Sequence, residues 1–264
     1  MNEMVELHVD GRGVARVTMN RPEVHNAFNA GMIAALSDVF RTVAARDGVR
    51  VMVLAANGRS FSAGADANWM KSFAAMSHAE NMKDAGELAA MLELLNRLPV
   101  PTIAAVNGAA FGGGVGLVAC CDVAVAVESA VFSLSEVRLG IIPATISPYV
   151  LAAIGPRQAR RWFTSGERFT AALAKEIGLV HELVPDLDAL DVAVEDLVRN
   201  YLMNGPEAVA AAKDLVFAVV NRPVDGSLMQ ETARRIADRR VSPEGQEGLA
   251  AFLAKRKPNW VRED

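Results

Sequence analysis

The first half of the chain alternates between short apolar runs and segments with helical spacing. Nearly continuous apolar runs, typical of strands covered on both faces, occur at 13–19, 50–56, 102–106 and 122–127. After the first run, apolar residues spaced i, i+3 and i+4 predict a helix that contains Met32, Ile33, Leu36, Val39, Phe40 and Val43. Further helices are predicted around 80–97, where Pro99 and Pro101 end the pattern, and near 114–120. Repeated strand–loop–helix units of this kind predict an α/β fold.

After Pro185 the pattern becomes helical. Helices are predicted at roughly 187–203, 206–220, 225–240 and 244–255, separated by proline-containing breaks. No flexible linker precedes them, so we expect one compact unit with a core at 1–190 and a helical segment at 191–264. That segment should pack on the core or on a neighbouring subunit.

Composition narrows the class of protein. Hydrophobic residues make up 52% of the chain and the mean hydropathy is +0.20, which favours burial of surface between subunits. A formal net charge of -4 gives no reason to expect a nucleic-acid partner. No run reaches the about 18 apolar residues of a membrane span, and the N-terminal MNEMVELHVD carries acids where a signal peptide is apolar. We therefore expect a cytoplasmic protein with no membrane partner.

Cys120 and Cys121 lie inside an apolar run and lack the spacing of a zinc site. They are predicted to be core residues, and no metal is expected.

Two loops crowded with glycine and alanine follow buried strands, SFSAGAD at 60–66 and NGAAFGGG at 107–114. Small residues let a backbone N–H approach a ligand atom closely, and a helix that begins after each loop would aim further free amides at the same point. The loops could together form an oxyanion hole. The alternatives are a tight turn with Asp66 as helix N-cap for the first loop, and close helix–strand packing for the second.

A dinucleotide-binding fingerprint also matches part of the second loop, at Gly114, Gly116 and Ala119. That fingerprint requires its first glycine directly after the strand, whereas seven residues separate Val106 from Gly114. We therefore reject it. A G-x-S-x-G nucleophile elbow is absent from the sequence.

Several longer motifs occur in one order along nearly the whole chain: RPEVHNAFN, FSAGADANWM, PTIAAVNGAAFGGGVGL, FSLSEVRLGIIP and the terminal AFLAKRKPNW. In this the sequence resembles the enoyl-CoA hydratase/isomerase superfamily, also called the crotonase family. The resemblance implies a spiral of ββα units, with a helical C-terminal segment that builds trimers, often paired into hexamers. It also implies an acyl-CoA substrate, with coenzyme A as part of the substrate and no separate cofactor.

The resemblance further implies roles for individual residues. The peptide N–H groups of Ala65 and Gly113 would hold the thioester carbonyl, and Glu136 would act as general acid and base. Coenzyme A would be bound by two groups of residues. The first group is Ala63, Asp66 and Ala67. The second is Phe252 and Lys255, which in the family often reach the nucleotide from an adjacent subunit.

One departure from the family pattern affects the mechanism. Typical hydratases of the family carry a first glutamate that falls on Gly116 in this chain. Three routes remain open: Glu136 acts alone through one water, another group substitutes, or the reaction is a Δ3,Δ2-enoyl-CoA isomerisation with a single base. A further alternative is a CoA-binding protein without activity.

A second departure concerns the acyl group. PATISPY at 143–149 resembles hydratases that act on branched acyl-CoAs of leucine and acyclic terpenoid breakdown, such as 3-methylglutaconyl-CoA. Thr145 and Ser147 either line the acyl pocket or are turn residues. Arg138 either pairs with a distal substrate carboxylate or is a surface arginine. His25 is predicted to be a loop residue or a residue at the edge of the CoA site.

Overall fold

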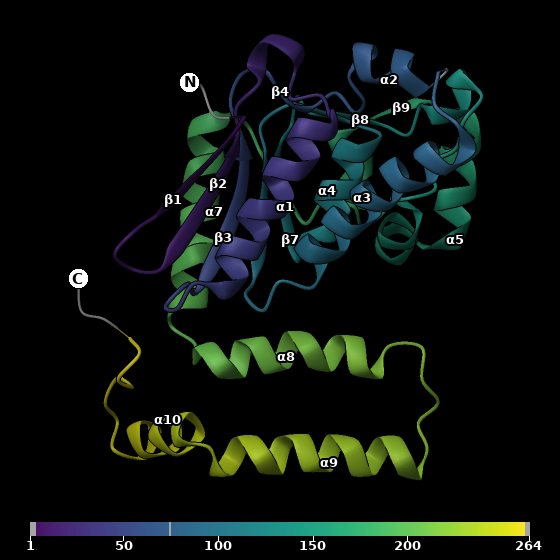
Figure 1. Cartoon of the computed structure of the whole chain (residues 1–264). Coiled ribbons are helices and arrows are strands. Elements are labelled where there is room, and N and C mark those ends of the chain that lie inside the picture. The colour runs from purple at the N-terminus through teal and green to yellow at the C-terminus, as the bar shows by residue number, and fades with distance from the viewer. Residues whose placement is uncertain (1–3, 74, 262–264) are drawn as a thin grey trace.

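The computed structural model describes residues 4–73 and 75–261 (Figure 1). In this part of the chain, six strands form the larger sheet, in the order β1-β2-β3-β5-β7-β10. The strands are β1 (Val5–Val9), β2 (Val14–Met19), β3 (Val51–Ala56), β5 (Thr102–Val106), β7 (Val123–Val127) and β10 (Glu182–Val184). The β1–β2 pair is antiparallel and the other pairs are parallel. The predicted α/β class is confirmed.

A smaller sheet consists of β4 (Ser60–Ser62), β6 (Ala109–Phe111), β8 (Val131–Ser133) and β9 (Arg168–Thr170), in that order. The β4–β6 and β6–β8 pairs are parallel, and β9 runs antiparallel to β8. Both β4 and β6 lie inside segments that the sequence pattern predicts as loops. With three residues each, they are too short to carry a recognisable alternation.

The two sheets are built by repeated units. Each unit gives one strand to the larger sheet, one to the smaller sheet, and then a helix: β3, β4 and α3 (His78–Asn96); β5, β6 and α4 (Gly113–Cys120); β7, β8 and α5 (Ser147–Ser165). This is the expected spiral of ββα units. Because β4, β6 and β8 are parallel neighbours, the loops that follow them emerge at one edge of the smaller sheet.

Helices cover both faces of the larger sheet. Figure 1 shows α1 (Ala30–Ala45) and α7 (Leu187–Leu202) on opposite sides of β1–β3. The apolar face that predicts α1 is buried, and Asn29 caps the helix by accepting a hydrogen bond from Met32 N at 2.8 Å. Shorter helices complete the body: η1 (Pro22–Val24), α2 (Ala67–Phe73), η2 (Glu136–Leu139) and α6 (Ala171–Glu176).

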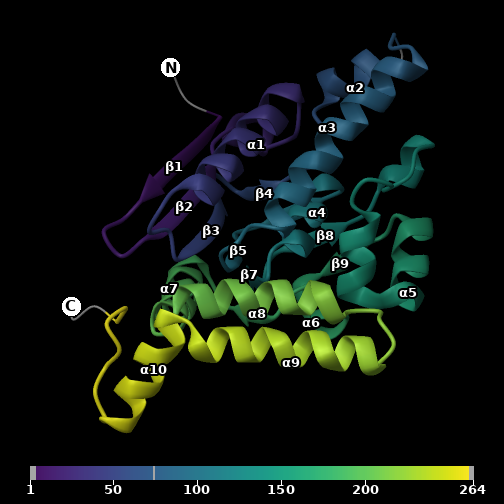
Figure 2. The same ribbon diagram turned by 60° about the horizontal axis from the view of Figure 1, so that its bottom comes forward.

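The remaining helices form an arm that extends from the body: α8 (Pro206–Val219), α9 (Gly226–Val241) and α10 (Pro243–Leu253). Both views show α8 and α9 side by side (Figures 1 and 2). The predicted boundary between 190 and 191 falls inside α7, whose Leu190, Val194 and Val198 are buried, so the arm itself begins with α8.

The arm is anchored to the body by Lys213 of α8. Its Nζ donates to Asp122 Oδ2 at 2.7 Å and to Val100 O at 3.1 Å. The arm also exposes large apolar side chains, at Val216, Val220, Val224, Met229, Ile236, Val241, Leu249, Phe252 and Leu253. Within the described residues, no helix combines the length and hydropathy needed to cross a bilayer.

Candidate active site

The loops that follow β4 and β6 lie against each other with no space for side chains. Gly64 has φ +85°, and a Cβ there would lie 3.1 Å from Phe111 O. Gly112 has φ +49°, and a Cβ there would lie 3.1 Å from Glu136 Oε1. Since L residues rarely adopt these φ values, glycine is required at both positions. Because Gly64 and Gly112 carry no side chains, the two loops and Glu136 can lie close together.

The backbone of Phe28 orients the first loop. Phe28 N donates to Gly64 O at 2.6 Å, and Asp66 N donates to Phe28 O at 2.8 Å. In such a bridge between Phe28 and Ala65, the N–H of Ala65 points away from Phe28. Among the described residues Ala65 N has no acceptor, and Ala65 lines a cavity.

The second loop ends where α4 begins, at Gly113. The first amides of a helix have no partner within the helix. Gly113 N accordingly has no acceptor in the described part of the chain, and the first helical bond is donated by Gly116 N to Gly112 O at 3.2 Å. Gly113 lines the same cavity as Ala65, so the structure brings both predicted donors to one space, at the positive end of α4.

Glu136 follows β8 and begins the short helix η2. Its Oε2 is buried and has no hydrogen-bond partner among the described residues. Burial raises the pKa of this carboxyl above its ordinary value. Glu136 lines the cavity with Ala65 and Gly113. A carboxyl in such surroundings holds a proton more readily than one in water, which suits general acid–base chemistry.

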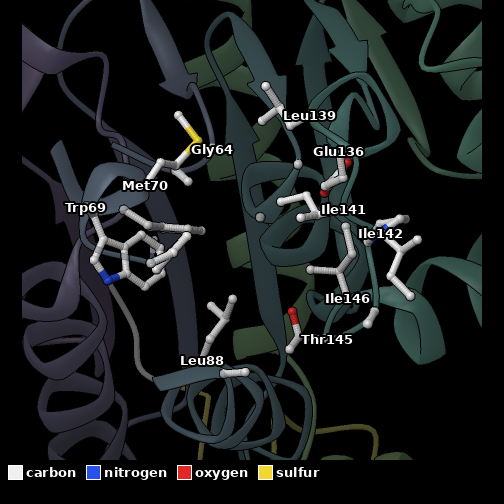
Figure 3. A pocket seen from close by; sticks show the side chains of 18 of the residues that line it. Gly64, Trp69, Met70, Leu88, Glu136, Leu139, Ile141, Ile142, Thr145 and Ile146 are labelled. Atoms are coloured by element: carbon white, nitrogen blue, oxygen red, sulfur yellow. The ribbon is translucent and has the colours of Figure 1, made fainter. Parts of the chain in front are cut away.

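The cavity has a volume of about 370 Å³. Figure 3 shows Trp69 and Met70 on one side, Glu136 and Ile141 on the other, and Leu88 at one end. Besides Glu136, its polar lining side chains in the described chain are Asn81, Asp84, Ser135 and Thr145. The space is large enough for a short acyl chain and mostly apolar, as small-molecule sites generally are.

Gly116 of α4 packs against Ile146, a residue of the cavity wall, and has no room for a side chain. A Cβ on Gly116 would lie 3.0 Å from Ile146 Cβ and closer still to Ile146 Cγ2. Ile146 is only 2% exposed and lines the cavity. The place of the missing glutamate is therefore filled by an apolar side chain from the segment before α5.

Asp84 of α3 is a second cavity carboxyl, which the sequence analysis did not single out. Its Oδ1 accepts a hydrogen bond from Trp69 Nε1 at 3.1 Å, and burial raises its pKa. A signal for it exists in the sequence, because Asn81, Asp84 and Leu88 fall on one face of the predicted helix. Leu88 is apolar, so polar residues on its face of the helix are candidates for the lining of a site.

The first group of predicted CoA-binding residues lies beside this cavity. Ala63 lines it, and Ala67 is exposed at the start of α2. The Asp66 carboxylate pairs with Arg21 Nη2 at 3.2 Å and accepts a hydrogen bond from Asn68 N at 2.8 Å. The bond from Asn68 N is the main cause that lowers the Asp66 pKa, so this side chain supports the loop.

The second group does not reach the cavity within one chain. Phe252 is 80% exposed on α10, and Lys255 follows this helix. Figure 1 shows α10 on the arm, away from α2 and α4, which border the cavity.

Of the other candidates, Thr145 lines the cavity. Ser147 is not a lining residue and donates its hydroxyl to Ala144 O at 2.8 Å. Arg138 lines a separate hollow with Arg168. Within residues 4–73 and 75–261, no group of three or more His, Cys, Asp or Glu side chains is placed to hold a metal ion.

The family model described as enoyl-CoA hydratase/isomerase matches residues 10–263. The chain belongs to this family and is an enzyme of it. It is 35% identical over 250 residues to the 2,3-dehydroadipyl-CoA hydratase of Escherichia coli, covering 94% of each protein.

Two crystal structures are similar over nearly their whole length. An enoyl-CoA hydratase from Shewanella pealeana is 43% identical with a TM-score of 0.94, covering 97% of this chain and 96% of that one. A putative enoyl-CoA hydratase/isomerase (crotonase) from Legionella pneumophila is 45% identical with a TM-score of 0.93, covering 98% and 100%.

Proposed function

We propose that this protein is an enoyl-CoA hydratase that adds water across the 2,3-double bond of an enoyl-CoA thioester. The observation that carries the proposal is the convergence of Ala65 N, Gly113 N and the Glu136 carboxyl on one cavity. Addition at C3 puts negative charge on the thioester oxygen. Preorganised N–H donors stabilise that charge, and one such donor is typically worth about 3–4 kcal/mol.

Glu136 moves the protons in this mechanism. As a carboxylate it takes a proton from water while the water oxygen bonds to C3 and the electrons of the double bond move to the thioester oxygen. The protonated Glu136 then gives a proton to C2, the thioester carbonyl re-forms, and the enzyme returns to its starting state. Because Ile146 fills the space beside Gly116, one carboxyl performs both transfers.

The test is turnover of crotonyl-CoA and 3-methylglutaconyl-CoA, followed by loss of the conjugated enoyl absorbance. Wild-type protein should hydrate at least one of them, and Glu136→Gln should lose activity by about 100-fold or more. Glu128→Gln, at an exposed carboxyl after β7, is the control and should match wild type. Undiminished turnover by Glu136→Gln would show that the mechanism is wrong.

A Δ3,Δ2-enoyl-CoA isomerase is the second candidate. The apolar Ile146 beside Gly116 favours it, because one base that carries a proton between C4 and C2 needs no second carboxyl. Oxygen-18 water separates the two reactions, since hydration places the label at C3 of the product and isomerisation leaves the product unlabelled.

For the acyl group, we propose a branched substrate of the 3-methylglutaconyl type, as in leucine breakdown. Support comes from the 143–149 segment, which provides Thr145 and Ile146 to the cavity wall. The lining described here holds the carboxyls Asp84 and Glu136 and no Lys, Arg or His, so a distal carboxylate would depend on Thr145, Asn81 or a neighbouring subunit. An uncharged analogue, 3-methylpent-2-enoyl-CoA, therefore belongs in the substrate panel.

We further propose a cytoplasmic homotrimer, or a hexamer of paired trimers, in which the arm of one subunit brings Phe252 and Lys255 to the CoA bound by its neighbour along 63–67. The exposed apolar residues of α9 and α10 support this, because such surfaces are costly in water. Light scattering of wild type and of Leu253→Asp tests it. A monomeric wild-type protein would contradict the proposal.

A further inference from the structure

We propose that Phe28 is a positioning residue that sets the separation between the two backbone donors, Ala65 N and Gly113 N. The inference rests on the proposed role of these amides as an oxyanion hole. Phe28 lies at the end of the turn that precedes α1, is 1% exposed, and lines the cavity. It contacts both donor loops by different means.

The contact with the first loop is made by the Phe28 backbone. Its N–H and C=O hold the residues on either side of Ala65, through Gly64 O at 2.6 Å and Asp66 N at 2.8 Å. With both neighbours held, Ala65 N–H has one direction, away from Phe28. The position of Phe28 therefore determines the position of the first donor.

The contact with the second loop is made by the Phe28 ring. A Cβ on Gly113 would lie 2.6 Å from Phe28 Cδ2 and closer still to Cε2, so the ring lies directly against the Gly113 backbone. A phenyl ring is planar and rigid, so it cannot adopt a more compact conformation. The start of α4, and with it Gly113 N, therefore packs at a distance from the first loop that the ring determines.

The turn that carries Phe28 cannot shift to absorb a change. Asn26, which is fully buried, donates its side-chain amide to Asn57 O and Ser60 O, both at 2.9 Å. Ser62 Oγ donates to Asn26 O at 2.9 Å, and Ala63 N donates to His25 O at 2.9 Å. Because the turn and the first loop move as one body, a change in side-chain size at 28 is transmitted to Gly113.

The experiment compares Phe28→Leu and Phe28→Met with Phe40→Leu, the same substitution at a buried phenylalanine of α1 that does not line the cavity. Two readouts report on the donors: kcat for hydration, and exchange of the C2 protons of a saturated acyl-CoA with deuterated water, which needs enolate formation but no attack of water on C3.

For both Phe28 variants we expect each rate to fall by about tenfold or more, because small displacements of catalytic groups have large effects. The dissociation constant for the acyl-CoA should change by less than either rate, since Phe28 is one lining residue among many and the others remain. Phe40→Leu should keep wild-type rates, which separates donor spacing from general loss of stability.

Gly113→Ala supplies the reciprocal test. Its new methyl group would overlap the Phe28 ring, so we expect a loss of about 100-fold in kcat. In the double variant with Phe28→Leu the smaller side chain makes room, and the loss should be well below the product of the two single losses.

The inference would be overturned if the loss of kcat in the double variant equalled the product of the losses in Gly113→Ala and Phe28→Leu. Wild-type kcat in both Phe28 variants would also overturn it. Wild-type protein with neither turnover nor C2 exchange would instead overturn the proposed function.

Discussion

Gly116→Ala should destabilise the fold although it adds one methyl group to a helix. The new Cβ would lie 3.0 Å from Ile146 Cβ and closer to Ile146 Cγ2, whereas carbon atoms in optimal contact are about 3.5–4.0 Å apart. Both residues are buried, so neither can turn towards solvent. Overpacking of a core costs about 1–3 kcal/mol, against a helix-propensity gain of about 1 kcal/mol for replacing glycine. Because the added Cβ would overlap two atoms of Ile146, we take the upper part of that range, about 2–3 kcal/mol. Subtracting the propensity gain leaves an expected net loss of about 1–2 kcal/mol in the free energy of unfolding.

The partner variant makes this a test of the contact itself. Ile146→Ala alone should cost about 2–5 kcal/mol, because it leaves a cavity. In the double variant the new methyl group at position 116 moves into the space that the isoleucine side chain vacates, so the combined cost should fall short of the sum by about 1 kcal/mol or more. Urea unfolding at one fixed protein concentration, followed by circular dichroism, measures all four proteins.

Additive costs, or a Gly116→Ala protein as stable as wild type, would refute the reasoning. The space beside position 116 would then be open, and the argument that a second carboxyl has no room there would fail with it.

Three further predictions concern charged groups. Because burial raises the Glu136 pKa, its contribution to stability is present below the ordinary carboxyl pKa and is lost as pH rises through the raised value. The melting temperature of Glu136→Gln relative to wild type should therefore increase as the pH is raised from below the ordinary carboxyl pKa to above the raised one. A difference that stays constant with pH would contradict this. Asp84→Asn should raise kcat/KM for 3-methylglutaconyl-CoA relative to 3-methylpent-2-enoyl-CoA by about tenfold, since it removes a like charge. Glu87→Gln, which changes a charge on the same helix outside the cavity lining, should leave that ratio unchanged, and equal effects would refute the role of Asp84. Lys213→Met should cost about 2–4 kcal/mol in urea unfolding because it leaves Asp122 without its cation in a partly buried site; a cost under about 0.5 kcal/mol would show that the pair is solvent-screened.

Long elements of this fold could be predicted from sequence because their pattern repeats within them. The spacing from Met32 to Val43 predicts α1, and the apolar run at 50–56 predicts β3 within one residue. β4 and β6 were predicted as loops. They are strands because β4 pairs with β6 and β6 pairs with β8, and these hydrogen bonds join segments far apart in the chain.

The candidate site likewise has features that the sequence indicated and features that only the structure shows. The resemblance to the family named Ala65, Gly113 and Glu136, and the structure brings all three to one cavity. Each comes shortly after a strand of the smaller sheet, and the parallel strands β4, β6 and β8 place the segments that follow them at one edge. The filling of the space beside Gly116 could not be predicted, because Ile146 belongs to another ββα unit and meets Gly116 only through packing of α5 on α4. Asp84 was missed although it shares a helix face with Asn81 and Leu88, because this spacing is a weak signal until the folded chain places that face against the cavity.

The proposed donors at Ala65 and Gly113 are peptide groups, which has a consequence for how the site tolerates mutation. Only a substitution by proline can remove a backbone N–H. Other substitutions can affect these N–H groups only by adding a side chain that displaces them. A library of all substitutions at positions 65 and 113 should therefore rank variants by side-chain volume, with hydrophobic and charged residues of equal size failing alike. At Glu136 the same library should rank variants by acidity. The proposed site would thus show two kinds of mutational tolerance, one governed by side-chain volume at positions 65 and 113 and the other by acidity at position 136.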